Sequence, residues 1–137
     1  MKVRKWFDIG YNFVVAGEDG LAYEGRGWDA QGAHTLNWNA QSVGIALVGN
    51  FSRHRAPAHL TDAVRRLIED GVNLGKIRAD FKLMAACQVR DYQSPGRMLF
   101  EEMTQWSHWW KHSLPDAFCP VEDDEGDQQE TDQEIHL

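Results

Sequence analysis

Strand-length apolar runs alternate with helical patterns along this chain, and the alternation limits it to a few layered folds. Residues 11–15 and 21–24 favour strands, and the Asp19-Gly20 pair between them is a strong hairpin turn signal. Residues 42–48 are rich in Val, Ile and Leu, as in a buried strand. Residues 81–87 form another apolar run of strand length.

Two amphipathic patterns predict helices after these runs. Thr61 is a good N-cap for the first helix, and Gly75 is a stop signal. Its apolar residues recur at helical spacing: Val64, Leu67, Ile68 and Val72. Ser94-Pro95 offers the second helix an N-cap and a proline at its first position. One face of that helix carries Leu99, Phe100, Met103 and Trp106. Together these patterns predict an α/β fold with a mixed central β-sheet flanked by helices.

The sequence predicts one domain over residues 1–112, followed by a linker and tail over residues 113–137. Hydrophobic residues make up 42% of the chain and include six Trp, which is enough for one core. Pro115 discourages helix formation in the linker. Residues 121–137 hold eight acidic residues and neither Lys nor Arg, so this segment cannot bury enough apolar surface to order itself.

The acidic tail accounts for the net charge of −7. Eight of the 21 acidic residues lie in it, which leaves 14 basic residues against 13 acidic ones elsewhere. The body therefore shows no basic patch that would indicate nucleic acid as a partner. No run of 18 or more apolar residues predicts a membrane span, and the first ten residues hold no apolar core of a signal peptide.

The cysteines and histidines do not form a recognisable disulfide scaffold or metal site. Cys87 lies in an apolar run and Cys119 lies beside the acidic tail, which favours two free thiols. His108 and His112 are spaced to bind a metal weakly on a helix, but no Cys, Asp or Glu is placed to complete that site. Solvated or packed histidines are the better interpretation, and no metal is expected.

Aromatic and polar side chains are unusually dense between residues 4 and 39. The set comprises Trp6, Tyr11, Tyr23, Trp28 and Trp38 with Arg4, Arg26, His34, Asn37 and Asn39. Aromatic rings cover the apolar faces of sugars, while amide, imidazole and guanidinium groups orient hydroxyls and carboxylates. The density indicates a groove for a sugar–peptide ligand. Some of the aromatic residues could instead belong to the core, and for Phe13 and Tyr23, which lie in predicted strands, the core is the favoured interpretation.

Several ordered motifs closely resemble the peptidoglycan recognition protein family. They are Asp8-Ile9-Gly10-Tyr11-Asn12-Phe13, Gly17-Glu18-Asp19-Gly20, Tyr23-Glu24-Gly25-Arg26-Gly27-Trp28, Gly32-Ala33-His34-Thr35, Ser42-Val43-Gly44-Ile45, Val48-Gly49-Asn50-Phe51, Ser94-Pro95-Gly96 and Trp106-Ser107-His108. The resemblance runs from about Lys5 to Trp110, with one extra residue in the hairpin region. It implies a central sheet flanked by helices and a groove for muramyl peptides. Catalytic members are zinc amidases that cleave between N-acetylmuramic acid and L-alanine.

The resemblance also implies that the zinc ligands, two His and one Cys, are absent from this chain. The first ligand belongs to a strand that should precede residue 1, so that strand is expected to be missing. The second corresponds to Ala86 and the third to Ser94. A methyl group has no donor atom and a serine hydroxyl is a poor zinc ligand. Tyr11 matches an assisting tyrosine, yet without the metal it has no polarised carbonyl to act on. The chain is therefore expected to bind without catalysis and without a cofactor.

For ligand binding, the resemblance implies a groove that involves Lys5, Trp6, Tyr11, Arg26, His34, Trp38 and Asn39. Trp6 and Arg26 match the pattern associated with stems that carry meso-diaminopimelic acid, whereas Lys5 departs from the usual glycine. An arginine suits the extra carboxylate of that stem, because a guanidinium makes bidentate, charge-assisted contacts. A solvent-facing Arg26 is the alternative interpretation.

Two further functions stay open. The chain could be a regulatory protein that binds ligand poorly and pairs with a related receptor, since a missing strand would leave a sheet edge unpaired. A zinc amidase is the least favoured function. Family resemblance implies a secreted protein or the ectodomain of a membrane receptor. Asn50-Phe51-Ser52 fits the N-glycosylation sequon, which matters only if the chain enters a secretory pathway.

Overall fold

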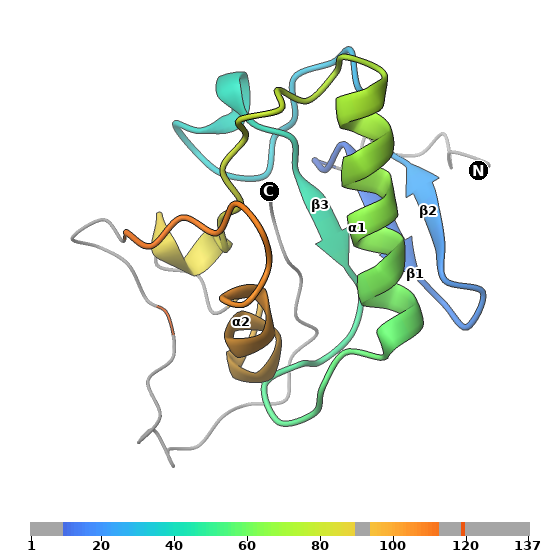
Figure 1. The fold of residues 1–137 in the computed structure, drawn as a ribbon, viewed down its shortest axis with the longest axis vertical. Helices are drawn as coiled ribbons and strands as arrows, with labels where there is room; N and C mark the ends of the chain where they lie inside the picture. The colour runs from blue at the N-terminus through green and yellow to red at the C-terminus, as the bar shows by residue number, and fades with distance from the viewer. Residues whose placement is uncertain (1–9, 90–93, 113–118, 120–137) are drawn as a thin grey trace.

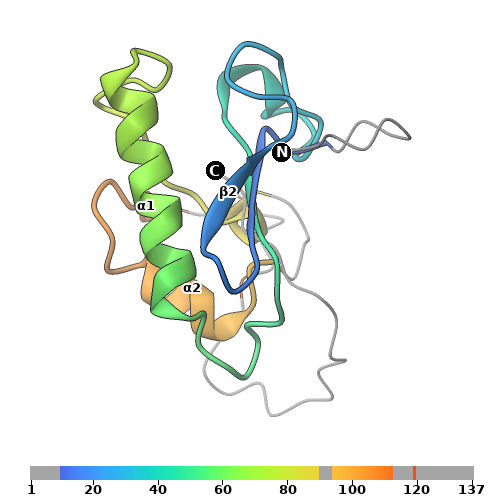
Figure 2. The ribbon, with the colours of Figure 1, turned by 90° about the vertical axis from the view of Figure 1, so that its right-hand side faces the viewer.

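The computed structural model describes residues 10–89, 94–112 and 119. A three-stranded mixed sheet forms its centre, in the order β2-β1-β3. Strand β1 (Phe13–Ala16) pairs antiparallel with β2 (Leu21–Glu24) and parallel with β3 (Ile45–Leu47). Figures 1 and 2 show helix α1 (Ala58–Asn73) covering one face of the sheet and helix α2 (Arg97–Met103) lying on the β3 side. The predicted mixed α/β architecture is confirmed.

The hairpin between β1 and β2 follows the prediction from the turn sequence. Gly17 and Gly20 have φ of 87° and 62°, values that suit glycine and allow the tight reversal. Val14 pairs with Tyr23 across the hairpin. Along β1 every second residue, Phe13 and Val15, is buried, as expected for a strand with one face on a core.

Helix α1 forms where its periodicity predicts, but it begins earlier than expected. The helix starts at Ala58, behind Pro57, so the prediction of Thr61 as N-cap is wrong. The fixed φ of proline, here −57°, prepares the first turn, and the Thr61 hydroxyl donates to the Ala58 carbonyl inside the helix. The predicted stop is confirmed, because the chain leaves the helix at Gly75 with φ of 73°.

The apolar run at residues 81–87 does not become a strand of the sheet, so that prediction is wrong. Only Leu83 forms a bridge, with Trp109, and Ala86–Gln88 form the 3₁₀ helix η2. Leu83 and Ala85 are nonetheless buried, at 1% and 0% exposure. A short apolar run shows that a segment is buried, but its periodicity does not say in which conformation.

The predicted N-cap of the second helix is also wrong. The Ser94-Pro95 peptide bond is cis, and Gly96, with φ of 88°, is the residue before α2. The helix ends at Met103, short of Trp106. Leu99 and Met103 on its predicted apolar face are fully buried, so the orientation of the helix agrees with the sequence pattern.

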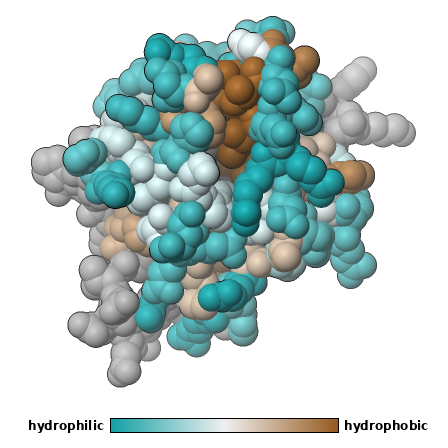
Figure 3. Space-filling view, in the orientation of Figure 1, coloured by the Kyte–Doolittle hydropathy of each residue, from teal (hydrophilic) through white to brown (hydrophobic). Residues whose placement is uncertain are grey.

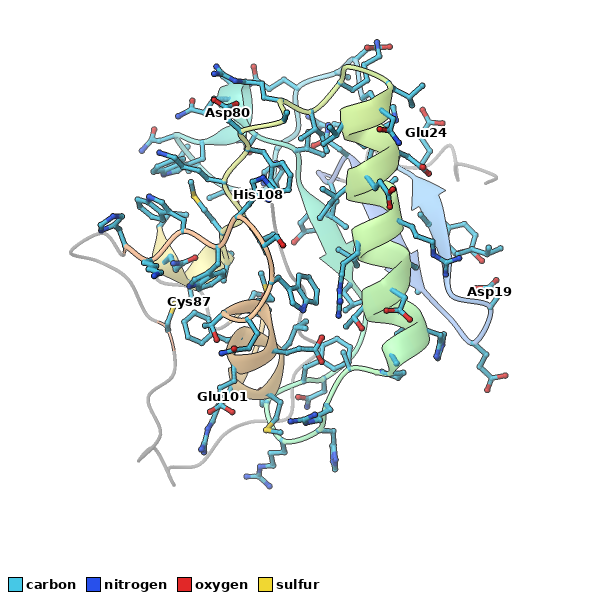
Figure 4. The ribbon with its side chains drawn as sticks, in the orientation of Figure 1. Asp19, Glu24, Asp80, Cys87, Glu101 and His108 are labelled. Carbon is cyan, nitrogen blue, oxygen red and sulfur yellow. A yellow bond between two sulfur atoms is a disulfide. The ribbon has the colours of Figure 1, made fainter. Side chains whose placement is uncertain are left out.

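Cys87 and Cys119 form a disulfide, which corrects the prediction of two free thiols. Cys87 lies in η2 with no exposure, beside the partly buried Cys119, and their Cα atoms are 4.8 Å apart (Figure 4). The prediction relied on neighbours along the chain, which carry no information on this spatial contact. The division into a domain and a tail stays a prediction, because residues 113–118 and 120–137 lie outside the described residues.

Candidate binding site

A cavity of about 720 Å³ lies between the loop at residues 28–43 and the segment at residues 76–89. In Figure 3, hydrophobic atoms on this face lie recessed between hydrophilic ones, to the left of α1. The residues of its wall include Asn12, Trp28, Asp29, Ala30, Gln31, Trp38, Asn39, Ser42, Val43, Lys76, Arg78, Asp80, Lys82 and Ala86. The cavity therefore combines aromatic, amide and charged side chains, as a pocket for a polar ligand with apolar faces requires.

The side chain of Asn12 connects the segments that form the cavity wall. Its Nδ2 donates to the carbonyls of Gly27 and Ala30, both at 2.8 Å, and its Oδ1 accepts from the Gly44 N–H at 2.9 Å. The side chain is 2% exposed. A buried amide with its hydrogen bonds satisfied joins the first turn of the loop to the entry of β3. Sequence reasoning missed this role, although a polar residue directly before a buried strand was a usable signal.

Trp38 and Asn39, two of the predicted groove residues, line the cavity, and their role in ligand binding stays a prediction. The Asn39 Oδ1 accepts from the backbone N–H of His34 at 2.9 Å and of Thr35 at 2.8 Å. This amide therefore shapes the loop. The Trp38 ring lies 6.3 Å from the ring of Trp110, which sequence reasoning did not place near the site. Trp110 therefore lies beside a wall residue of the cavity, although it is not itself part of the lining.

Tyr11 and His34 lie next to each other but outside the cavity lining. Their rings are stacked, with centroids 6.0 Å apart and 12° between the planes. The His34 Nδ1 shares a 2.9 Å hydrogen bond with the Thr35 hydroxyl, and the ring packs against Gly32 and Gly44, where a Cβ would collide with it. Burial, and then the charge of Arg26, lower the pKa of His34 to about 4. The imidazole is therefore neutral at pH 7.

Arg26 lies at the margin of the cavity. Its Nη1 donates to the carbonyl of Gln31 at 3.0 Å, and Gln31 is a lining residue. The Arg26 backbone N–H donates to the Tyr11 carbonyl at 3.0 Å, which fixes the start of this loop. The guanidinium is thus anchored near the cavity. Lys5 and Trp6, the other two predicted groove residues, lie outside the described residues.

Charged side chains also line the cavity and form a rim of Asp29, Lys76, Arg78 and Asp80. Lys76 Nζ reaches Asp29 Oδ1 at 2.7 Å and so joins the two walls. Arg78 makes two hydrogen bonds to Asp80, of 2.8 and 2.9 Å, which lower the pKa of the Asp80 carboxyl. Figure 4 shows Asp80 near the top of the molecule. Because these pairs are exposed, they shape the rim more than they stabilise the fold.

The two positions that the resemblance assigned to zinc ligands lie close together. Ala86 lines the cavity at 2% exposure, and the backbone N–H of its neighbour Cys87 donates to the Ser94 carbonyl at 3.1 Å. Among residues 10–89, 94–112 and 119, no three His, Cys, Asp or Glu side chains gather in a group able to hold a metal ion.

The histidine pair near the end of the domain is not on a helix. His108 has a positive φ of 70°, stacks on Phe81 with ring centroids 4.0 Å apart, and contacts the Ala79 carbonyl through Nε2 at 3.1 Å. His112 packs edge-on against Trp110. The expectation that these histidines are packed or solvated agrees with these contacts. None of the helices in the described ranges has the length and apolar character that a bilayer crossing requires.

Comparison with known proteins agrees with this geometry. The family described as N-acetylmuramoyl-L-alanine amidase matches residues 1–110. Peptidoglycan-recognition protein LE of Drosophila melanogaster is 45% identical over 107 residues, which cover 78% of this chain and 31% of that protein.

Solved structures of related proteins share the fold. The structure of peptidoglycan recognition protein LE in complex with tracheal cytotoxin, a monomeric diaminopimelic acid-type peptidoglycan, has a TM-score of 0.73 at 45% identity and covers 77% of this chain and 61% of that one. The ectodomain complex of peptidoglycan recognition proteins LCa and LCx with tracheal cytotoxin gives 0.71 at 40% identity, covering 74% and 60%. The chain thus spans less than two thirds of these relatives. It belongs to the N-acetylmuramoyl-L-alanine amidase family and, within that family, to the peptidoglycan recognition proteins.

Proposed function

We propose that this chain binds peptidoglycan fragments and does not cleave them. The observation that carries the proposal is the cavity that Trp38 lines on one side and Ala86 on the other. A cavity of about 720 Å³ is in the range of ligand sites, and its mixture of rings and polar groups suits a sugar–peptide. Relatives of the same fold have been solved with tracheal cytotoxin bound.

The residues at the family's zinc position do not fit the metal. A catalytic zinc needs three protein ligands with nitrogen, sulfur or carboxylate donors, in addition to its water. Ala86 offers only a methyl group, and Ser94 offers a hydroxyl, which is a poor zinc ligand. An amidase uses its zinc ion to polarise the carbonyl of the scissile bond and to activate a water molecule. The side chains of Ala86 and Ser94 can do neither. Binding is the activity that remains.

Arg26 supports a preference for stems that contain meso-diaminopimelic acid. Its Nη1 is held by the carbonyl of Gln31, a residue of the cavity wall, so the guanidinium lies within reach of a ligand at that margin. The extra carboxylate of diaminopimelate offers a charge-assisted contact to this group, whereas a lysine stem carries the same side-chain amine without that carboxylate.

Calorimetry with two muropeptides tests this proposal. We expect the diaminopimelate-type fragment to bind at least tenfold more tightly than the lysine-type fragment, a difference of about 1.4 kcal/mol. Arg26→Ala should remove that preference, while Arg53→Ala, an exposed arginine beyond the far end of β3, should retain it. Equal affinities in the original chain, or an unchanged preference in Arg26→Ala, would contradict the assignment of Arg26.

A second experiment addresses cleavage. The folded chain is loaded with zinc, dialysed, analysed for metal and assayed on a substrate with the muramyl–L-alanine bond. We expect substoichiometric zinc and no product. Stoichiometric zinc together with turnover would overturn the non-catalytic proposal and leave the binding proposal intact.

The second candidate is a regulatory protein that pairs with a related receptor. Within the described residues β2 lies at one edge of the sheet, and its residues Leu21, Ala22 and Glu24 are exposed. An edge strand can pair with a further strand from another chain. Two related ectodomains form a complex with one ligand. Association with such a relative, seen by sedimentation without any heat from muropeptide, would favour this function over direct recognition.

A further inference from the structure

One chemical motif of the chain has no part in the binding site. Asn50-Phe51-Ser52 is the only Asn-Xaa-Ser/Thr triplet in the sequence. It lies in the connection between β3 and α1, which runs along the bottom of Figure 1. Next to it, Arg53, His54 and Arg55 are exposed. In this segment the chain reaches the protein surface directly after the buried strand β3.

The triplet has a defined local geometry. The Asn50 Oδ1 accepts the backbone N–H of Ser52 at 3.1 Å, which closes an Asx-type turn. Phe51 anchors that turn, because its side chain is only 4% exposed and its carbonyl accepts the Met98 N–H at 2.9 Å. The Asx turn engages the oxygen of the Asn50 carboxamide. Its Nδ2 has no hydrogen-bond partner among the described residues.

The disulfide between Cys87 and Cys119 gives an independent indication of compartment. Structural disulfides form and persist in oxidising environments, chiefly along the secretory pathway and outside the cell. Cys87 is fully buried, so this bond belongs to the packed core. N-linked glycans are attached in the same pathway, on Asn-Xaa-Ser/Thr triplets.

We propose that Asn50 carries an N-linked glycan. The Asn50 Nδ2 attacks the anomeric carbon of a lipid-diphosphate-linked oligosaccharide and loses one proton. The bond between that carbon and the diphosphate oxygen breaks, and the lipid diphosphate leaves. The donor and the transferase belong to the secretory pathway, and no electron transfer is involved. The product is a glycosylamide bond at a half-buried side chain on the surface connection.

The folded protein accommodates such a glycan without closing the cavity. Ser42 and Val43, which enter β3, line the cavity, whereas Asn50 follows the other end of the strand. Figure 1 shows β3 running from the cavity loops above to the connection below. Six residues lie between Val43 and Asn50, with β3 among them, and an extended segment of this length spans on the order of 20 Å. A glycan at Asn50 therefore projects from the opposite end of the sheet.

The test is expression of the chain behind a cleavable secretion leader in cultured mammalian cells. We expect one glycan, removed in a single mobility step by peptide N-glycosidase F, with the Asn50 peptide converted to an aspartate-containing peptide in the mass spectrum. Ser52→Ala should abolish the modification while leaving Asn50 in place, and Ser52→Thr should retain or raise its occupancy. Asn73→Gln, at an exposed asparagine outside any triplet, should not change it.

Direct mass spectrometry of the unsubstituted chain keeps the test independent of how the variants fold. A secreted chain with the Cys87–Cys119 disulfide and an unmodified Asn50 would overturn the proposal. A glycan that persists in Ser52→Ala would overturn it as well. Muropeptide calorimetry on the glycosylated and deglycosylated forms should give affinities within a factor of two, because the glycan lies away from the cavity.

Discussion

The buried carboxamide of Asn12 accepts a 2.9 Å hydrogen bond from the Gly44 N–H and so fastens the start of β1 to the entry of β3. The same side chain donates to two carbonyls of the following loop, Gly27 and Ala30. One residue therefore joins three segments that are distant in sequence. The cavity wall depends on this junction, because Asn12 and Ala30 both belong to it.

Replacing Asn12 should destabilise the whole domain. Asn12→Ala removes three hydrogen bonds and should lower the free energy of unfolding by about 3 kcal/mol, at about 1 kcal/mol for each bond. Asn12→Asp keeps the acceptor but loses the donor and buries a charge, so it should be no better. Urea unfolding measures both. Asn73→Ala, at an exposed position near the end of α1, is the control and should change the unfolding free energy by under about 0.5 kcal/mol.

Removing the disulfide should lower the free energy of unfolding, because the unfolded chain gains conformational entropy without the cross-link. The bond closes a sequence separation of 32 residues. The loop-entropy relation gives about 3–4 kcal/mol for a loop of this size. We expect the double variant Cys87→Ala/Cys119→Ser to unfold at lower urea concentration by that free energy. Reductant should destabilise the original chain and leave the double variant unchanged. If reductant lowered the urea midpoint of both equally, the Cys87–Cys119 disulfide would be contradicted.

The stability of the fold should depend on pH through His34. Its folded pKa of about 4 lies below its ordinary value of 6.5, because burial and Arg26 disfavour the charged ring. Between these values the unfolded chain binds more protons than the folded one, so the contribution is complete above pH 6.5 and is lost as pH falls towards 4. Urea midpoints between pH 7.5 and about 4 measure it. His34→Gln should reduce this slope, and an unchanged slope in that variant would contradict the assignment to His34.

Trp38 should contribute to ligand binding by contact with a sugar or peptide face. We expect Trp38→Ala to weaken muropeptide binding about tenfold, or 1.4 kcal/mol, because truncating an aromatic wall removes apolar contact area. Leu36→Ala is a matched control, since Leu36 is 58% exposed in the same loop and does not line the cavity. Circular dichroism checks that both variants fold. Equal losses of affinity would argue against a direct role for Trp38.

Local pattern predicted the parts of the fold that depend on neighbours in the chain. The Asp19-Gly20 turn and the Val64 to Val72 spacing act within one hairpin or one helix, so short-range rules suffice for them. The conformation of residues 81–87 depends instead on the residues that pack around them. Leu83 finds a partner in Trp109, a contact that no periodicity encodes.

The candidate site shows the same division. Trp38 and Asn39 were predicted as groove residues by family resemblance and do line the cavity. Lys76 and Asp29 were not, although their ion pair joins the two walls, because residues 47 apart meet only after folding. Trp110 was missed for the same reason. Whether any of these residues contacts ligand stays a prediction.

The link between Cys87 and Cys119 also determines what a protease can separate. Lys111 is exposed and lies between the two cysteines in sequence. A trypsin-like cut after Lys111 therefore leaves the downstream piece covalently attached to the body through sulfur. Such a nicked molecule migrates as one species until thiols are added, and a loss of mass seen only on reducing gels is the signature of cleavage there.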